Sequence, residues 1–188
     1  DSKIDLITAN AGSNSVSVLL DNGDGTFQPK QDYAAGTQPI SVFAIDVNEY
    51  STIDLITGNL NGKSVSGVLG NGNGTLETPQ NFAAEAQPSS VFSISVNEDS
   101  TIDLITANLN GKSVSLLVGN GNGTFQAEQV YTVGSAPMSM FAFDVNQDST
   151  IDLITANSNG NSISVLLGNG NDTFEAKKRN IKTIENFS

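Results

Sequence analysis

The sequence of 188 residues contains no cysteine, no histidine and no tryptophan. Without cysteine the chain forms no disulfide and offers no thiolate to a metal, so the redox compartment stays undetermined. The usual serine and cysteine hydrolase triads are also excluded, because they need a histidine base or a cysteine nucleophile. No apolar run approaches the roughly 20 residues of a membrane-spanning helix, and no secretory signal is visible. We therefore expect a protein that is not an enzyme and does not insert into a membrane.

Positive charge is scarce as well. Acidic residues outnumber basic ones 20 to 8, which gives a formal net charge of −12. Half of the basic residues lie close to the C-terminus, at Lys177, Lys178, Arg179 and Lys182. A surface this acidic, with no basic stripe interleaved with aromatic residues, repels phosphate backbones. The composition therefore predicts that the protein has no nucleic-acid partner.

The most informative feature is a strict internal repeat. The triplet Ile-Asp-Leu starts at four positions, each 49 residues after the last: Ile4, Ile53, Ile102 and Ile151. A period in this range is typical of an array of one supersecondary unit. The pattern divides the chain into units of approximately 1–35, 36–84, 85–133 and 134–176, followed by a non-repeat tail, 177–188. Because the first unit begins in mid-repeat, we expect the chain to be a piece of a longer protein that carried any export signal.

Each unit contains four short apolar runs bounded by Gly, Asn, Asp or Pro. In the second unit the runs are 41–45, 53–57, 64–69 and a fourth from Thr75 to Phe82. Runs of this length with such boundaries indicate strands joined by tight turns. Alternation of Val and Ser within 15–20 predicts half-buried strands, and the even spacing of Phe125 and Tyr131 predicts that both lie on one face. We predict an all-β fold, a β-propeller-type array of four-stranded antiparallel blades with about four repeats.

Two segments of the fourth unit, Asp144–Leu153 and Ser164–Phe174, resemble the FG-GAP/VCBS repeat of integrin-α-like β-propellers and of many large secreted proteins. Gly36-Thr37-Gln38-Pro39 and Gly134-Ser135-Ala136-Pro137 match the GAP part of that pattern, whereas Glu85 replaces the glycine in the third unit. The resemblance covers residues 1 to about 176. It implies a secreted or extracellular location, complete propellers of about seven blades, and Ca²⁺ bound in the loop between the first and second strands.

The same loop can be considered from its residues alone. In the fourth unit, oxygen ligands alternate along the loop: Asp144, Asn146, Asp148, the Thr150 carbonyl and Asp152. Ca²⁺ takes six to eight hard oxygen ligands, so this loop is the best candidate for a site. Its sixth position is Ser149 where glycine would ease the sharp turn.

The other loops are poorer candidates. The second has Asp46, Asn48, the Thr52 carbonyl and Asp54, but Tyr50 stands at the fifth position. The third has Asn97, Asp99, the Thr101 carbonyl and Asp103, but Ser95 stands at the first position. The first loop keeps only Asp1 and Asp5. The alternative is that Asp and Asn occur here because they form turns without any ion.

These features favour a non-catalytic extracellular recognition or adhesion module with a protein or glycan ligand. Loops near Gln38, Gln87 and Ala136 are candidates for the binding surface. The alternative is an accessory or structural domain of a larger secreted enzyme that acts on polysaccharide or protein. An incomplete propeller leaves blade faces bare, so we expect the chain to self-associate unless four blades close into a ring.

Overall fold

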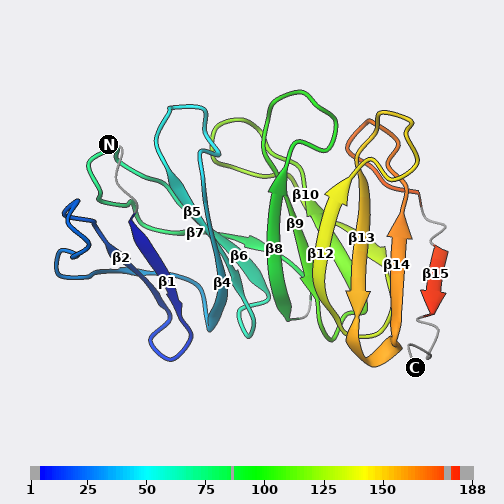
Figure 1. Ribbon diagram of the computed structural model, residues 1–188, viewed down its shortest axis with the longest axis horizontal. Coiled ribbons are helices and arrows are strands. Elements are labelled where there is room, and N and C mark those ends of the chain that lie inside the picture. The colour runs from blue at the N-terminus through cyan, green and yellow to red at the C-terminus, as the bar shows by residue number, and fades with distance from the viewer. Residues whose placement is uncertain (1–4, 86, 176–178, 183–188) are drawn as a thin grey trace.

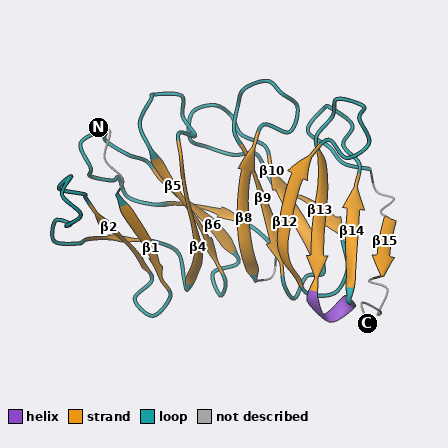
Figure 2. Cartoon of the chain, in the orientation of Figure 1, coloured by secondary structure: helices purple, strands orange, loops and turns teal. Residues whose placement is uncertain are grey.

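The structure, a computed structural model, describes residues 5–85, 87–175 and the backbone of 179–182. Four antiparallel sheets, which we call blades one to four, stand in a row along the molecule (Figure 1). Strands and loops make up nearly all of the described chain, and its single helix is a short 3₁₀ turn, η1 (Ser158–Gly160) (Figure 2). No helix in this described part is long and apolar enough to cross a membrane. The all-β prediction is confirmed.

Blade one contains β1 (Leu6–Asn10), β2 (Ser15–Leu19) and β3 (Gln31–Ala34). Blade two contains β4 (Pro39–Ile45), β5 (Asp54–Asn59), β6 (Ser64–Val68) and β7 (Gln80–Ala83). Blade three contains β8 (Pro88–Ile94), β9 (Asp103–Asn108), β10 (Ser113–Leu117) and β11 (Gln129–Thr132). Blade four contains β12 (Pro137–Phe143), β13 (Asp152–Asn157), β14 (Ser162–Leu166) and β15 (Arg179–Lys182). In each blade the strands pair in chain order, and the described part of blade one starts with the second strand of its unit.

Local sequence explains the strand ends. Each first strand opens with proline, which suits a strand start because its missing N–H breaks no ladder bond there, and the register shifts immediately after it. The Asn-Gly turns between third and fourth strands place Gly72 and Gly74 at φ of 73° and 84°. Glycine reaches such left-handed conformations without the steric cost that a side chain brings.

Every sheet has two differently composed faces. We call face A the apolar one, represented in blade two by Ile56 and Val65, and face B the one that carries Leu55, Thr57 and Asn59. Face A of each blade packs on face B of the next, and the three hydrophobic clusters of the core lie at these three junctions. The core is therefore a series of three equivalent layers between blades.

This packing corrects two predictions. Alternation within 15–20 predicted a half-buried strand, but Ser17 of β2 is buried together with Val16 and Val18, and every residue of β5, β6, β9 and β10 is buried as well. The polar side faces the preceding blade instead of water. The shared face predicted for Phe125 and Tyr131 is also wrong, because Phe125 belongs to the junction of blades two and three and Tyr131 to that of blades three and four. Residues 126–128, which lie between them, belong to no strand. An even spacing across such a segment does not place two side chains on the same face.

The fourth strand of blade four lies in the segment that the repeat pattern assigned to a tail. In the earlier blades the third strand pairs Val16 with Tyr33 and Val65 with Phe82. The 49-residue period would pair Ile163 with Asn180, but the structure pairs it with Ile181. A connection one residue longer thus shifts the strand, and the unit continues to Lys182 rather than ending at 176.

Candidate functional site

The loops between first and second strands and the turns between third and fourth strands lie at the same end of the blades, at the top of Figure 1. We call this the loop end. Its first-to-second loops span residues 46–53, 95–102 and 144–151, and they contain all the residues predicted to bind Ca²⁺ in blades two to four except the aspartates that open the next strand.

Those aspartates, Asp54, Asp103 and Asp152, are at most 1% exposed. The two carboxylate oxygens of Asp103 accept backbone N–H bonds from Val96 at 2.8 Å and from Gly119 at 2.9 Å. The same two bonds recur at Asp54 and Asp152. Burial raises the pKa of Asp54 and of Asp103 despite these bonds. Asp152 is the ninth residue of its loop counted from Asp144, and Asp54 and Asp103 are the equivalent residues. Each of these aspartates therefore ties its loop to the turn after the third strand.

The blade-four loop brings three of its predicted ligands together. The Asp148 N–H donates to Asp144 Oδ1 at 3.2 Å and to Asn146 Oδ1 at 3.1 Å, and the Asn146 amide donates to Asp148 Oδ2 at 2.8 Å. Hydrogen bonds from the Thr150 hydroxyl, the Asn146 amide and the Thr150 N–H hold the pKa of Asp148 below its ordinary value. Asp144 also accepts N–H bonds from three other loop residues, Asn146, Gln147 and Ser149.

The loops of blades two and three are closed by similar turns. Asp46 accepts N–H bonds from Asn48 at 3.2 Å and Ser51 at 2.7 Å. In blade three, the Asn97 side chain accepts the Asp99 N–H at 2.9 Å, and Asp99 accepts the Thr101 N–H at 2.8 Å. Bonds of this kind are the turn-forming role that Asp and Asn play without an ion.

The residues fit a calcium site only partly. Nowhere in the described ranges do three acidic side chains gather as they would around one metal ion. In blade four, Asp148 is exposed and Asp144 is half-buried, and the Asp144 carboxylate accepts N–H bonds from its own loop; Asp152 is buried and accepts two backbone N–H bonds. From the predicted set, blade two contributes the half-buried carboxylate of Asp46 and blade three the exposed carboxylate of Asp99. In the first loop, Asp5 accepts the Asp21 N–H at 2.9 Å, and Asp1 lies outside the described residues.

The sharp turn predicted at the sixth loop position is present in all three loops. Ser51, Ser100 and Ser149 adopt φ of 60°, 73° and 66°. These are left-handed conformations, which favour glycine. The backbone conformation at this position favours glycine, but all three loops have serine there.

Adjacent blades interlock at the loop end. The Asn97 amide of blade three donates to Asp172 Oδ2 of blade four at 3.0 Å. One junction earlier, a Cβ built on Gly123 would lie 3.6 Å from the Cβ of Asn48. Tyr50 projects from this platform with 76% of its surface exposed. The loops thus form a connected surface of carboxylates and amides with one prominent aromatic ring.

The linkers near Gln38, Gln87 and Ala136 lie at the opposite end. All three residues have left-handed φ, between 56° and 62°. Their carbonyls accept N–H bonds from the hairpins between second and third strands, at Leu60, Leu109 and Ser158. Ala136 is buried. The binding role predicted for these linkers stays a prediction.

Sequence reasoning missed a polar ladder on face B. In blade two the Thr57 hydroxyl donates to Asn59, whose amide donates to Ser66, whose hydroxyl donates to Asn81 at 2.6 Å. Blades one and three repeat it, with Asp32 and Glu128 as the terminal acceptors. The sequence pattern that could have indicated this ladder is Thr-x-Asn followed by Ser-x-Ser, which recurs every 49 residues. Because each link is satisfied, the ladder can be buried without the cost of an unpaired polar group.

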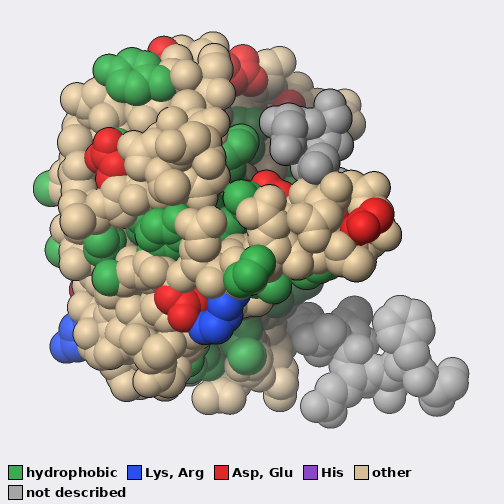
Figure 3. All heavy atoms as spheres, turned by 90° about the vertical axis from the view of Figure 1, so that its left-hand side faces the viewer, with side chains coloured by type: hydrophobic (Ala, Val, Ile, Leu, Met, Phe, Trp, Pro, Cys, Tyr) green, Lys and Arg blue, Asp and Glu red, His purple; other side chains and the backbone are tan. Residues whose placement is uncertain are grey.

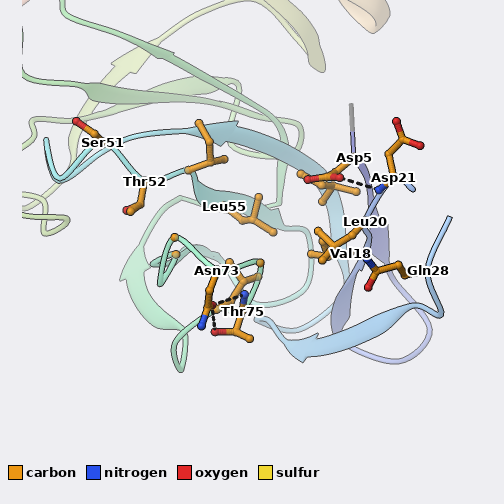
Figure 4. Close-up of a pocket in the computed structure, with 16 residues that line it drawn as sticks. Asp5, Val18, Leu20, Asp21, Gln28, Ser51, Thr52, Leu55, Asn73 and Thr75 are labelled. Carbon is orange, nitrogen blue, oxygen red and sulfur yellow. Dashed lines mark hydrogen bonds between the residues drawn. The ribbon is translucent and has the colours of Figure 1, made fainter. Parts of the chain in front are cut away.

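A cavity of about 480 Å³ opens between blades one and two, lined by residues that include Asp5, Leu20, Leu55 and Thr75 (Figure 4). At the next two junctions, Val47 and Val96 from the first-to-second loops are buried in the corresponding clusters. We assign the cavity no ligand.

Comparison with known proteins agrees with this architecture. Residues 95–155 match the family model of the FG-GAP-like repeat. A search of curated proteins gives no match. Among solved structures, one on the recognition of non-reducing terminal N-acetylglucosamine by an Agrocybe aegerita lectin aligns with a TM-score of 0.64 at 20% identity, over 94% of this chain and 48% of the other.

Two further structures align at lower identity. A chain of the crystal structure of BBS1N in complex with ARL6DN gives a TM-score of 0.63 at 9% identity, over 95% of this chain and 52% of the other. A protein of unknown function from Desulfotomaculum acetoxidans DSM 771 gives 0.61 at 14% identity, over 82% and 48%. The similar structures are β-propellers, and the open row of blades fits a partial propeller. The chain spans about half the length of each.

Proposed function

From the premise that the chain is built of FG-GAP-like repeats, we propose that it is a non-catalytic recognition module of a secreted or cell-surface protein and that its loop end binds a neutral glycan. The observation that carries this proposal is the exposed ring of Tyr50, in a loop that the Asn48 side chain holds by accepting the Tyr50 N–H at 3.1 Å. An aromatic ring offers an apolar face to the C–H groups of a sugar, and the polar side chains can bond its hydroxyls.

The rigidity and the charge of this surface refine the ligand class. Loops already tied by hydrogen bonds lose little further freedom when a ligand binds, so less of the interaction energy is spent on ordering them. The net charge of −12 disfavours sulfated or sialylated chains. The fold shared with the Agrocybe aegerita lectin supports glycan binding only by analogy, because one fold hosts many functions.

A glycan array with the whole chain tests the proposal. We expect binding to neutral glycans that is lost in Tyr50→Ala and largely kept in Tyr50→Phe, since the ring rather than the hydroxyl makes the contact. Tyr131→Phe is the matched control, because that tyrosine lies in a junction. Absence of binding by the native chain, or equal binding by Tyr50→Ala, would overturn the proposal.

The second candidate function is an accessory domain of a larger secreted enzyme, where the same surface would hold a polysaccharide substrate for a neighbouring catalytic domain. The chain spans about half the length of the similar structures, which is the observation that favours a larger parent protein. Sequencing the complete gene distinguishes the two, because a glycosidase or protease domain beside the repeats would select the accessory role.

We also propose that the blade-four loop binds one Ca²⁺ weakly through Asp144, Asn146 and Asp148. Two carboxylates four residues apart, Asp144 half-buried and Asp148 exposed, support this, and few charged ligands mean low affinity. Millimolar Ca²⁺ should raise the melting temperature, and Asp148→Ala should remove most of the rise. Asp99→Ala, in a loop without a first-position carboxylate, should leave it intact. Superimposable melts in EDTA and Ca²⁺ would refute the site.

A further inference from the structure

The turns between third and fourth strands in blades two and three each contain two asparagines, and a glycine follows each of them. In blade two these steps are Asn71-Gly72 and Asn73-Gly74, and both asparagines are exposed. Asparagine before glycine is chemically labile, because the backbone nitrogen of glycine can attack the side-chain amide with no side chain of its own in the way. The turn therefore holds two candidate sites for the same reaction.

The two side chains make different hydrogen bonds. The Asn73 side-chain oxygen accepts the Thr75 N–H at 3.0 Å and the Thr75 hydroxyl at 2.6 Å. The Asn71 side chain is a donor instead, and its amide donates to the Thr75 hydroxyl at 2.9 Å. Of the two amides, that of Asn73 has two donors on the oxygen where negative charge develops during nucleophilic attack. Donors in this place stabilise the transition state.

The same bonds favour the position of the nucleophile. The hydrogen bond from the Thr75 N–H back to the Asn73 side chain folds the side-chain carbonyl over the intervening peptide, toward the Gly74 nitrogen. Within the described chain the Gly74 N–H donates to no acceptor, so no hydrogen bond has to break before it reacts. A reacting pair that is already held together needs less ordering to reach the transition state.

Blade one shows that donors in this turn favour a negative oxygen. Asp24 stands at the position of Asn73 and accepts the same two bonds from Thr26, at 3.0 Å from the N–H and 2.6 Å from the hydroxyl. The bond from the Thr26 hydroxyl, and then that from the N–H, hold the pKa of Asp24 below its ordinary value. The turn thus also accommodates the carboxylate that loss of the amide would leave.

We propose that Asn73 is a site of spontaneous deamidation that the fold promotes, with Gly74 as the nucleophile and water as the second reactant. The Gly74 nitrogen loses its proton to a base in solution and forms a bond to the side-chain carbonyl carbon of Asn73. The bond from that carbon to the amide nitrogen breaks, and the nitrogen leaves as ammonia after taking up a proton from water. A second water then opens the cyclic imide at either carbonyl, which leaves aspartate or isoaspartate.

Blade three repeats the arrangement with poorer access for solvent. The Asn122 side chain accepts the Thr124 N–H at 3.1 Å and the Thr124 hydroxyl at 2.6 Å. Gly123 is buried, whereas Gly74 is half-buried. Because the glycine N–H has to lose its proton to solvent, Asn122 should convert more slowly than Asn73.

Deamidation would change the loop end as the molecule ages. Each conversion adds one negative charge to a chain whose net charge is already −12. Seen from blade one, most of the surface is uncharged and acidic side chains are scattered over it (Figure 3). Isoaspartate also lengthens the main chain, which would disturb the bond from the Asn71 N–H to the Thr75 carbonyl that closes the turn. The inference is independent of the glycan proposal.

Peptide mass spectrometry of the whole folded chain, incubated for weeks near neutral pH, tests the proposal. Fragment spectra locate each replacement of an amide NH₂ by OH. We expect Asn73 to convert at least about fivefold faster than Asn71, the equivalent of one hydrogen bond, although Gly72 is more exposed than Gly74. In the native chain unfolded in urea the two rates should be similar, because both asparagines precede glycine.

Substitutions of the donor separate its effect from that of the sequence. Thr75→Val removes the hydroxyl but keeps the shape of the side chain, so it should slow the conversion of Asn73 about fivefold. Thr75→Ser keeps the hydroxyl and should keep the native rate. Thr124→Val is the matched control, which should slow conversion at Asn122 and leave Asn73 unchanged. Melting curves show whether each variant is folded.

Three results would overturn the inference. In the folded chain Asn71 could convert as fast as Asn73, Asn73 could stay intact while the unfolded chain converts, or folded Thr75→Val could convert at the native rate. The comparison of folded with unfolded native chain needs no substitution, so it decides the matter even where Thr75→Val does not fold.

Discussion

The carboxylate of Asp103 accepts a hydrogen bond from the backbone N–H of Gly119 at 2.9 Å and so ties the start of a second strand to the turn that leaves the third. Its other oxygen accepts the Val96 N–H. The arrangement needs two acceptors at one buried point, which a carboxylate has and an amide lacks.

Asp103→Asn should therefore destabilise the chain by about 1–3 kcal/mol, because the new NH₂ group would face a backbone N–H that loses its partner. Urea unfolding near neutral pH measures the change. Asp24→Asn is the matched control, since Asn73 and Asn122 already occupy the equivalent turn position in other blades, and it should change stability little. Equal effects of the two substitutions would contradict the buried tie.

Gly119→Ala should cost about 1–3 kcal/mol through steric overlap in a packed region. A Cβ at this position would lie 2.2 Å from the carbonyl oxygen of Ile102 and 3.1 Å from its carbonyl carbon, and a backbone group cannot move aside as a flexible side chain can. At Gly12 nothing lies within 4 Å of such a Cβ. Gly12→Ala should consequently have a urea midpoint equal to that of the native chain or slightly above it. A loss of stability in Gly12→Ala as large as that in Gly119→Ala would argue against the close approach of Gly119 to the Ile102 carbonyl.

Asp32 supplies a test by pH. Hydrogen bonds from Lys30 and then from the Ser17 hydroxyl lower the pKa of Asp32 in the folded chain. A lowered pKa contributes stability that is fully present above the unfolded value near 3.8 and disappears as the pH falls through the folded value. The native chain should thus be more stable than Asp32→Asn at about pH 7, with the difference vanishing at about pH 2. Urea midpoints of both chains across this range give the answer, and a difference independent of pH would refute it.

Much of the fold follows from the sequence because the 49-residue period is strict. Short apolar runs between Gly, Asn and Asp place the strands, and the predicted second, third and fourth strands of blade two overlap β5, β6 and β7. What alternation could not show is that Ser and Thr on the other face contact a neighbouring blade. Small hydroxyl residues suit water equally well, and their burial depends on the ladder from Thr57 to Asn81 that only the assembled sheet completes.

The candidate site was less predictable for a related reason. Spacing alone cannot distinguish a carboxylate that faces an ion from one that faces backbone N–H groups, and Asp152 does the latter. The shift of β15 was equally hidden, because the period pointed to Asn180 where the structure has Ile181. In the sequence, Tyr50 was notable only because it replaces the carboxylate found at the fifth loop position of the fourth unit, Asp148.

The packing of face A on face B extends to the loop end, where it can be trapped covalently. At the junction of blades two and three, the Cβ of Asn48 lies 3.6 Å from the place of a Cβ on Gly123, within the range of a disulfide. At Gly25, the equivalent turn position of blade one, nothing lies within 4 Å of such a Cβ. Asp172 occupies the equivalent turn position at φ 59°, so a side chain is tolerated there.

Non-reducing electrophoresis of the oxidised Asn48→Cys/Gly123→Cys variant is the most direct test that face A of one blade packs on face B of the next. The chain has no other cysteine, and Asn48→Cys/Gly25→Cys is the control pair, which should keep both thiols free. Our account predicts that the first variant closes its disulfide within one chain and migrates faster than its reduced form. Retention of both free thiols in the first variant, or disulfides only between chains, would contradict it.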